Sequence, residues 1–321
     1  MKKSFFSVFF CLIISTTSFA QIDPPENIRE LMMYEDSLNQ LGQIIMNSQI
    51  IKERAEANYK YIPMLVKALK VPGSFDYPFS NIKTMLTIYP KDRSFRILTW
   101  QLSFETDSAW MLEEYRYFGV IQMYSEDLKI YPLMDRSDSL AHPVDSVFAD
   151  RNWFGMLYYN IIEQKLKKDK TRGIHIKKCY TLFGYDGNDV TSNKKVIDVL
   201  WFDEDTPKFG LPVFRYYDDS TETESFDNRV VIEYRNNADA TLNYSSIHKK
   251  IVYDHLVPPD KLSEGIYFLY VPDGSYEGFS WRKKKYWDYV NTVFTFSIDE
   301  YDNPPVPEPI KGMKGAKDFK D

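Results

Sequence analysis

Apolar residues in the first part of the chain recur at intervals of three and four. The residues that carry this spacing are Leu31, Tyr34, Leu38, Leu41 and Ile45. Such a period places side chains on one face of a helix, so we predict helical structure across residues 24–70. A second, shorter helix is predicted over Tyr61–Lys70, with Pro63 in its first turn, where a proline is tolerated.

From residue 75 onward, short runs of β-branched and aromatic residues alternate with turn signals, a pattern typical of strands. The predicted strands are Thr84–Tyr89, Phe95–Leu102, Tyr117–Tyr124, Leu128–Leu133, Trp153–Gln164, Ile174–Phe183, Lys195–Phe202, Val213–Tyr217, Arg229–Arg235, Thr241–Tyr244, Lys249–Asp254, Ile266–Val271, Tyr276–Trp281 and Tyr286–Val290. Short connections favour antiparallel pairing, because parallel strands need long crossovers. Pro272-Asp273-Gly274 is predicted to form a turn.

These patterns predict an α+β protein. A helical segment, residues 21–73, is expected to pack on a large, mainly antiparallel β-meander domain, residues 74–300. A small propeller-like β array is the alternative, although the sequence shows no repeat of fixed period. Residues 301–321 combine prolines with glycine and lysine, a composition that does not build a core, and we expect a disordered tail there.

The N-terminus has the layout of a secretory signal peptide. Lys2 and Lys3 precede an apolar run, and small residues lead to a predicted cleavage between Ala20 and Gln21. The apolar run is shorter than the roughly 20 residues that span a bilayer. Residues 1–20 therefore predict export to the periplasm or the extracellular space, with no transmembrane segment after cleavage.

Composition narrows the class of partner. The formal charge of −6 argues against nucleic acid, because such partners usually leave a basic footprint. The run Arg282–Lys285 is a local exception, predicted to be a solvated hairpin tip, with polyanion binding as the alternative. Cys179 is the single cysteine after cleavage, which excludes an intrachain disulfide, and its setting predicts a buried strand position.

Aromatic residues make up 16% of the chain. Most of them fall inside predicted strands, where aromatic side chains stabilise sheets by cross-strand pairing. Stacking of exposed rings on sugars is the alternative interpretation. Two acidic runs, residues 203–205 and 218–227, are predicted to be solvated loops.

Motifs for catalysis or cofactor binding are missing from the sequence. It contains no HExxH, G-x-S-x-G, P-loop or G-x-G-x-x-G. His248 and His255 flank a predicted strand seven residues apart, which places them on opposite faces. We therefore predict no catalytic residue and no cofactor. The other two histidines are His142 and His175.

The most polar turn is GYDGNDVTSNKK, residues 184–195. A calcium loop of the EF-hand type that starts at Asp186 needs oxygen ligands at its fifth and twelfth positions and glycine at its sixth. The chain has Val190, Ile197 and Thr191 at those positions. Asp-Gly is also a preferred hairpin dipeptide, so an exposed turn is predicted. The weak candidate metal ligands that remain are Asp186, Asn188 and Asp189.

Several Asp-Ser pairs are followed by a small or aliphatic residue. They resemble the acceptor triplet for O-glycosylation of exported Bacteroidota proteins. The sites that we predict on this basis are Ser108, Ser139 and Ser146. The alternative is that these pairs only form turns and caps, where both residue types are favoured.

Scattered blocks between residues 84 and 290 resemble a family of exported Bacteroidota proteins. The blocks are FRILTWQL, FGVIQMY, CYTLFGYDGNDVTSNKKVIDVLWF, GLPVF, NRVVIEY, IVYDHLVPP and YVPDGSYEGFSW. The resemblance implies export and a shared β architecture. That family has no established activity, so the resemblance assigns no catalytic residue.

The sequence thus favours a non-catalytic binding or scaffold module of the periplasm or cell envelope, with a protein or a glycan as its partner. The alternative is a secreted hydrolase that acts on glycan or peptide through carboxylates assembled by the fold. A hydrolase of that kind needs a cleft with two carboxylates, or a carboxylate beside a histidine. A binding module needs an exposed aromatic or flat surface.

Overall fold

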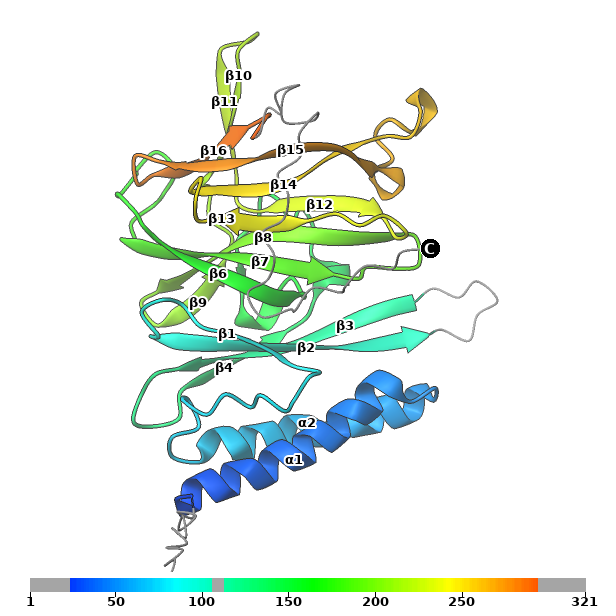
Figure 1. The fold of residues 1–321 in the computed structure, drawn as a ribbon. Helices are drawn as coiled ribbons and strands as arrows, with labels where there is room; N and C mark the ends of the chain where they lie inside the picture. The colour runs from blue at the N-terminus through cyan, green and yellow to red at the C-terminus, as the bar shows by residue number, and fades with distance from the viewer. Residues whose placement is uncertain (1–23, 106–112, 294–321) are drawn as a thin grey trace, which may run out of the picture.

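The computed structural model describes residues 24–105 and 113–293. Within them, a helical hairpin and three β-sheets are stacked as successive layers, with the helices at one end of the stack (Figure 1). The predicted signal peptide with Ala20 and Gln21, the candidate Ser108 and the tail 301–321 lie outside the described residues.

The helical layer is an antiparallel pair, α1 (Glu26–Asn47) and α2 (Ile51–Lys70). The predicted second helix is wrong in its start, because α2 begins ten residues before Tyr61 and Pro63 lies in its interior. An internal proline removes one backbone hydrogen bond and normally weakens a helix. Here the helix continues through it because Tyr61, Leu65 and Leu69 on either side of Pro63 are buried.

The first sheet packs directly on the helices (Figure 1). Its strands pair in chain order and are all antiparallel. They are β1 (Leu86–Ile88), β2 (Phe95–Glu105), β3 (Glu113–Met123) and β4 (Ile130–Met134).

The middle sheet has the order β5-β9-β8-β7-β6, and β12 also pairs with the first half of β8. All its pairs are antiparallel. Its strands are β5 (Phe148–Ala149), β6 (Leu157–Lys165), β7 (Lys178–Asp186), β8 (Ser192–Asp203), β9 (Thr206–Phe209) and β12 (Val230–Arg235).

The third sheet has the order β11-β10-β16-β15-β14-β13. Its β10–β16 pair is parallel, whereas its other pairs are antiparallel. Its strands are β10 (Phe214–Asp218), β11 (Thr223–Asp227), β13 (Leu242–Ser245), β14 (Lys250–Val257), β15 (Val271–Arg282) and β16 (Tyr286–Val290).

A separate hydrophobic core fills each space between layers. Alternation along β2 shows how: Leu98, Trp100 and Leu102 face the helices, while Phe95 and Ile97 face the middle sheet. Residues of the middle sheet alternate in the same way between the first and third sheets. This period of two is what a strand covered on both faces requires.

The α+β prediction is confirmed: two N-terminal helices precede a large, mainly antiparallel β region in the described residues. The β region is three open sheets stacked on one another, so the propeller-like alternative is wrong. Each sheet buries one or both faces against a neighbouring layer, which removes the need for closure around an axis.

Three local predictions in the β region are wrong. Ile266–Val271 is not a strand, because Tyr267–Leu269 form the 3-10 helix η4 and β15 begins only at Val271. Pro272-Asp273-Gly274 does not reverse the chain but lies within β15, where two extra residues bulge out between the Asp254–Tyr276 and Leu256–Pro272 pairs. Gly274 has φ +88°, which suits such a bulge. The acidic run 218–227 is no loop, because it forms most of the β10–β11 hairpin.

Candidate functional site

The turn between β7 and β8 is held by a tyrosine from the first sheet. The hydroxyl of Tyr117 donates to Asp186 Oδ1 at 2.9 Å and accepts from the Gly187 N–H at 2.7 Å. Asp186 is buried, so its predicted exposure is wrong, because the ring of Tyr117 from a different layer reaches the turn. Burial raises the pKa of the Asp186 carboxyl above its ordinary value.

The second acid of the turn, Asp189, caps the start of β8. Its Oδ1 accepts from the backbone N–H groups of Thr191 at 2.7 Å and Ser192 at 3.1 Å. Partial burial works against ionisation, but these donations prevail and hold the pKa of Asp189 below its ordinary value. The carboxylate therefore fixes the local backbone, as Asp commonly does in turns.

A side-chain oxygen of each of the three weak metal candidates, Asp186, Asn188 and Asp189, accepts a hydrogen bond from a protein donor. The Lys194 ammonium lies 2.5 Å from Asn188 Oδ1, where it would repel a cation. Asp186 Oδ1 accepts the hydrogen bond from Tyr117, and Asp189 Oδ1 accepts those from Thr191 and Ser192. No group of three His, Cys, Asp or Glu side chains in the described residues is placed to hold a metal ion.

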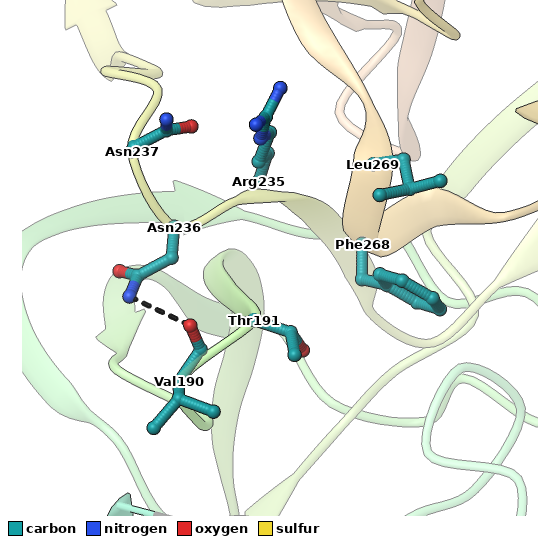
Figure 2. Close-up of a pocket in the computed structure, with 7 residues that line it drawn as sticks. All are labelled: Val190, Thr191, Arg235, Asn236, Asn237, Phe268 and Leu269. Carbon is teal, nitrogen blue, oxygen red and sulfur yellow. Dashed lines mark hydrogen bonds between the residues drawn. The ribbon is translucent and has the colours of Figure 1, made fainter.

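Beside this turn lies a pocket of about 440 Å³, which we call the β12 pocket. It is formed by the turn before β8, by the end of β12 with the residues that follow it, and by the 3-10 helix η4 (Tyr267–Leu269) (Figure 2). Its lining residues are Val190, Thr191, Arg235, Asn236, Asn237, Phe268 and Leu269.

Asn236, which lines the β12 pocket, belongs to a network of side-chain amide groups. Asn236 Nδ2 donates to Val190 O at 3.1 Å, and Asn193 Nδ2 donates to Asn236 Oδ1 at 2.9 Å. Tyr185 in turn donates to Asn193 Oδ1 at 2.8 Å. The Arg235 N–H donates to Tyr270 O at 3.0 Å, which joins β12 to the end of η4. The segments that form the pocket are thus tied to one another.

Other lining groups are presented to the open space. Figure 2 shows the side chains of Arg235 and Asn237 extending upward from the β12 end, with no hydrogen bond to the other residues drawn. The Phe268 ring extends from η4 in a different direction, to the lower right in Figure 2, and is 42% exposed. The pocket therefore combines one aromatic face with guanidinium and amide groups.

A second pocket of about 420 Å³ is lined by another residue of η4. Tyr267, which is 60% exposed, lines it together with Lys194 and Glu233. The Glu233 carboxylate accepts from Ser192 Oγ at 2.6 Å and so is engaged by the start of β8. η4 thus supplies neighbouring aromatic residues to two adjacent hollows.

Two of the histidines lie beside a carboxylate, and they form two separate pairs, His255 with Asp273 and His175 with Asp203. His255 Nδ1 lies 2.8 Å from Asp273 Oδ2, and His175 Nε2 lies 3.4 Å from Asp203 Oδ1. Both histidines are exposed or nearly so. Asp254 is occupied elsewhere, because it accepts from the N–H and hydroxyl of Thr241. These acids therefore serve different local contacts.

Sequence reasoning missed a completely buried ion pair. Arg229 Nη2 lies 2.9 Å from Asp198 Oδ1, and the hydroxyl of Tyr158 donates to Asp198 Oδ2 at 3.3 Å. Arg229 also donates to Pro143 O. The sequence signal that could have revealed this pair is a charged residue in each of two largely apolar predicted strands, Asp198 in Lys195–Phe202 and Arg229 in Arg229–Arg235. The arrangement joins β8, β12 and the 143–148 loop, so its role is structural.

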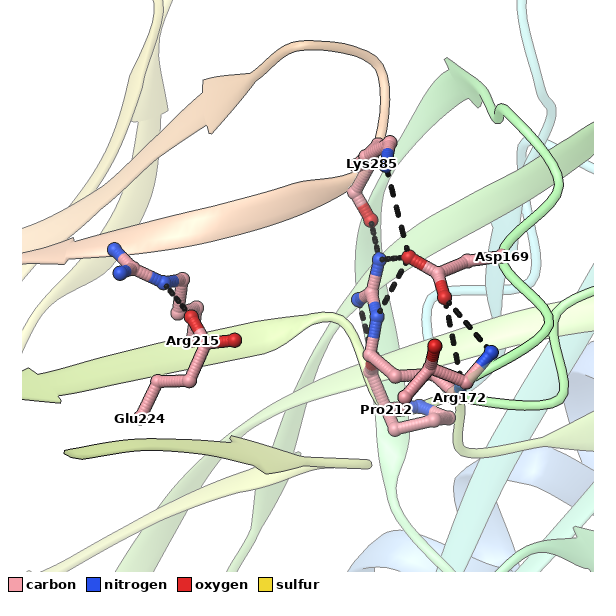
Figure 3. Close-up of polar contacts among 7 residues, drawn as sticks. Asp169, Arg172, Pro212, Arg215, Glu224 and Lys285 are labelled. Atoms are coloured by element: carbon pink, nitrogen blue, oxygen red, sulfur yellow. Dashed lines mark hydrogen bonds and ion pairs between the residues drawn. The ribbon is translucent and has the colours of Figure 1, made fainter.

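The basic run at the β15–β16 turn meets a second basic segment, the 166–173 loop. Lys167 N–H donates to Lys284 O at 2.8 Å, and Lys285 Nζ lies 3.8 Å from Asp169 Oδ2 (Figure 3). Arg172 donates to Lys285 O and lowers the pKa of Asp169 by its hydrogen bond to that carboxylate. Arg282–Lys285 is the hairpin turn that the sequence predicted.

The acidic hairpin is neutralised in part by Arg215. Its Nε donates to Glu224 Oε2 at 2.8 Å (Figure 3), and its Nη1 donates to Asp288 Oδ1 at 2.8 Å. Hydrogen bonds to these two carboxylates raise the pKa of Arg215. The contacts link β10 to both neighbouring strands, β11 and β16.

Two candidate glycosylation sites lie in the described residues. Ser139 is exposed at the end of the 3-10 helix η1 (Ser137–Ser139), and its hydroxyl donates to Arg136 O at 3.0 Å. Ser146 is half-buried and donates weakly to Ala141 O at 3.4 Å. Modification at either serine stays a prediction.

Comparisons with protein-family models, with curated proteins and with solved structures yield no match to the chain. Neither α1 nor α2, nor any other helix of the described part, has the length and apolar character to cross a membrane. Evidence for function therefore comes from the geometry and chemistry of the surface beside β12.

Proposed function

We propose that the chain is a non-catalytic binding module of the cell envelope and that the β12 pocket holds a glycan. The observation that supports it is that the exposed Phe268 lines the same pocket as Arg235 and Asn237. A sugar ring has an apolar face that packs on an aromatic side chain and a rim of hydroxyls that need polar partners. The pocket offers both kinds of group at one place.

The pocket is also built in advance of binding. The amide network of Asn193 and Asn236 and the backbone bond from Arg235 to Tyr270 fix the three contributing segments. A rigid site loses little conformational entropy when it takes up a ligand. This supports a binding role in which the walls need not rearrange.

Hydrolysis requires carboxylates that are free to act on the substrate. None of the described residues that line the β12 pocket is an acid. In the adjacent pocket, the carboxylate of Glu233 is engaged by Ser192. The chemistry of this surface therefore supports binding more directly than it supports glycan or peptide cleavage.

A glycan array followed by calorimetric titration with the oligosaccharide that binds best tests the proposal. Phe268→Ala should weaken binding about fivefold, because a stacking contact contributes roughly 1 kcal/mol. Arg235→Ala should weaken it by a similar factor. Leu262→Ala is the control and should leave affinity unchanged. Leu262 is 92% exposed and lies six residues before Phe268 in the chain.

Two results would refute this function. One is the absence of binding to every array glycan. The other is binding that Phe268→Ala and Arg235→Ala leave intact. Release of reducing ends during incubation with the bound oligosaccharide would instead favour the hydrolase.

A further inference from the structure

A third pocket lies where the helical hairpin meets β2 and β3, in other layers than β12. Its volume is about 270 Å³. The residues that matter here are Ser48 and Gln49 from the α1–α2 connection, Arg54 from α2 and Gln101 from β2. Ile45 and Met46 add an apolar wall. We call it the Arg54 pocket.

Arg54 is 6% exposed, and its Nε and Nη2 atoms are buried without a hydrogen-bond partner. A guanidinium stays charged at every physiological pH. A buried charge without a counterion is strongly destabilising. Such a group is retained at low cost only if an anion reaches it.

The other two buried arginines of the described residues show how the charge of a guanidinium is compensated here. Arg96 donates to Gln122 Oε1, Tyr77 O, Tyr89 Oη and Ser74 O at distances between 2.8 and 3.0 Å. Arg229, whose Nε and Nη2 atoms also lack a hydrogen-bond partner, is compensated by the carboxylate of Asp198, which lies 2.9 Å from Nη2. Arg54 differs from both, because no described residue places a carbonyl or a carboxylate against its Nε and Nη2 atoms.

A second orphaned group lines the same pocket. Gln101 Oε1 is buried and has no hydrogen-bond partner. The acid nearest in sequence, Glu53, accepts from Ser48 Oγ at 2.7 Å, so its carboxylate serves the helix connection. Among the described residues that line the pocket there is no Asp or Glu. Two unsatisfied groups on one small cavity indicate a ligand rather than a packing irregularity.

We infer that the Arg54 pocket binds a small anion through its carboxylate or phosphate group. Nε and Nη2 form one edge of the guanidinium, and two parallel N–H groups on one edge match the two oxygens of such an anion. Gln101 Oε1 accepts from a hydroxyl on the same molecule. The ligand is therefore a small hydroxy acid or a hydrogen phosphate.

This site is independent of the glycan proposal. It is built from α1, α2, β2 and β3, whereas the β12 pocket is built from the turn before β8, from β12 with the residues that follow it, and from η4. Loss of one binding activity should leave the other unchanged, so the two proposals succeed or fail separately.

Thermal unfolding and calorimetric titration of the full chain test the site, with lactate and inorganic phosphate as probes and sodium chloride at matched ionic strength as the reference. A ligand that binds only the folded state raises Tm with the logarithm of its concentration. We expect one probe to raise Tm above the chloride reference. The anion that does so identifies the carboxylate or the phosphate source.

Arg54→Met should abolish the ligand-dependent rise. It should also unfold no earlier than the wild type in chloride alone, because it removes a buried unpaired charge and keeps similar volume. Lys52→Met is the matched control on the same helix, with an 83% exposed side chain, and should keep the response. Gln101→Leu should weaken binding at least tenfold, which provides a second variant if Arg54→Met does not fold.

The inference is overturned if neither anion raises Tm above the chloride reference at millimolar concentration. It is also overturned if Arg54→Met and Gln101→Leu, as far as they fold, respond to the anions as the wild type does.

Discussion

Tyr117 links two layers through a single hydroxyl. That hydroxyl donates to Asp186 and accepts from Gly187, while the ring lies in the core between the first and middle sheets. Burial is the main reason that the pKa of Tyr117 is raised, with the neighbouring Asp186 charge second. The hydroxyl therefore keeps its proton, and so its ability to donate, above the pH at which an ordinary tyrosine ionises.

Tyr117→Phe should lower the free energy of unfolding by about 1–3 kcal/mol, because it leaves a buried carboxylate and a buried N–H without their partner. Urea denaturation followed by tryptophan fluorescence measures the loss. Tyr124→Phe, at a 68% exposed tyrosine of the same sheet, should cost less than about 0.5 kcal/mol. Equal losses in the two variants would contradict the structural role of the Tyr117 hydroxyl.

Asp273 has a carboxyl whose pKa lies well below its ordinary value. Hydrogen bonds from the hydroxyl and N–H of Ser275, followed by contact with His255, lower its pKa to about 2. A lowered pKa in the folded state stabilises the protein above the unfolded value, which is near 4. That contribution is lost as the pH falls from about 4 towards 2, and solvent exposure keeps it small.

Ser275→Ala should raise the pKa of Asp273 towards its ordinary value, because it removes the largest cause of the shift. Carbon-detected NMR titration of the Asp273 carboxyl measures the change. Ser220→Ala is the matched control, since Ser220 donates to Asp218 in the same way. It should leave the Asp273 titration unchanged, and an unchanged Asp273 in Ser275→Ala would refute the assignment.

Among the elements, β15 shows how glycine acts at two positions for different reasons. At Gly278 an added Cβ would lie 1.9 Å from the Ile251 carbonyl oxygen in β14. At Gly274 nothing lies within 4 Å, but φ is +88°. The first position is constrained by the neighbouring strand and the second only by its own backbone.

Gly278→Ala should therefore cost at least about 2–3 kcal/mol, because backbone atoms of β14 must move. Gly274→Ala should cost about 1 kcal/mol, the usual penalty of a side chain at positive φ. Chemical denaturation of both variants provides the comparison. A Gly278→Ala variant as stable as Gly274→Ala would show that β14 and β15 pair less tightly than the structure indicates.

At the scale of the whole molecule, the middle sheet is the most protected layer. Phe183 and Ile197 face the third sheet, while Leu182 and Val196 face the first. Strands covered on both faces open only when the layers separate, whereas exposed hairpins open locally. The β10–β11 hairpin is the opposite case, with its outer residues in solvent.

Hydrogen exchange followed by mass spectrometry should show this difference. Backbone amides in peptides from β7 and β8 should exchange at least about a hundredfold more slowly than those from β10 and β11, since local opening costs far less than global unfolding. The α1 and α2 peptides should fall between them. Equal protection in β8 and β11 would contradict a stack in which the middle sheet is shielded on both sides.

What the sequence determined by itself was local. The period of three and four specified the amphipathic α1, and the alternation of β-branched and aromatic residues specified most strands and their antiparallel pairing. These features are encoded by neighbouring residues, because side-chain direction follows directly from helix or strand geometry. The same local logic failed at Pro63 and at Pro272–Gly274, where packing against other elements overrode the usual preference of proline and glycine for a boundary.

Only the tertiary structure decided how three sheets stack and which polar groups meet. Tyr117 and Asp186, Asp198 and Arg229, and Arg54 and Gln101 are brought together from distant strands and helices. No local period records such a meeting, because it depends on the order of the layers and on burial that the whole fold creates. The Arg54 pocket illustrates the reason: an arginine on a helix is ordinary in sequence, and it becomes a candidate anion site only when folding removes its water.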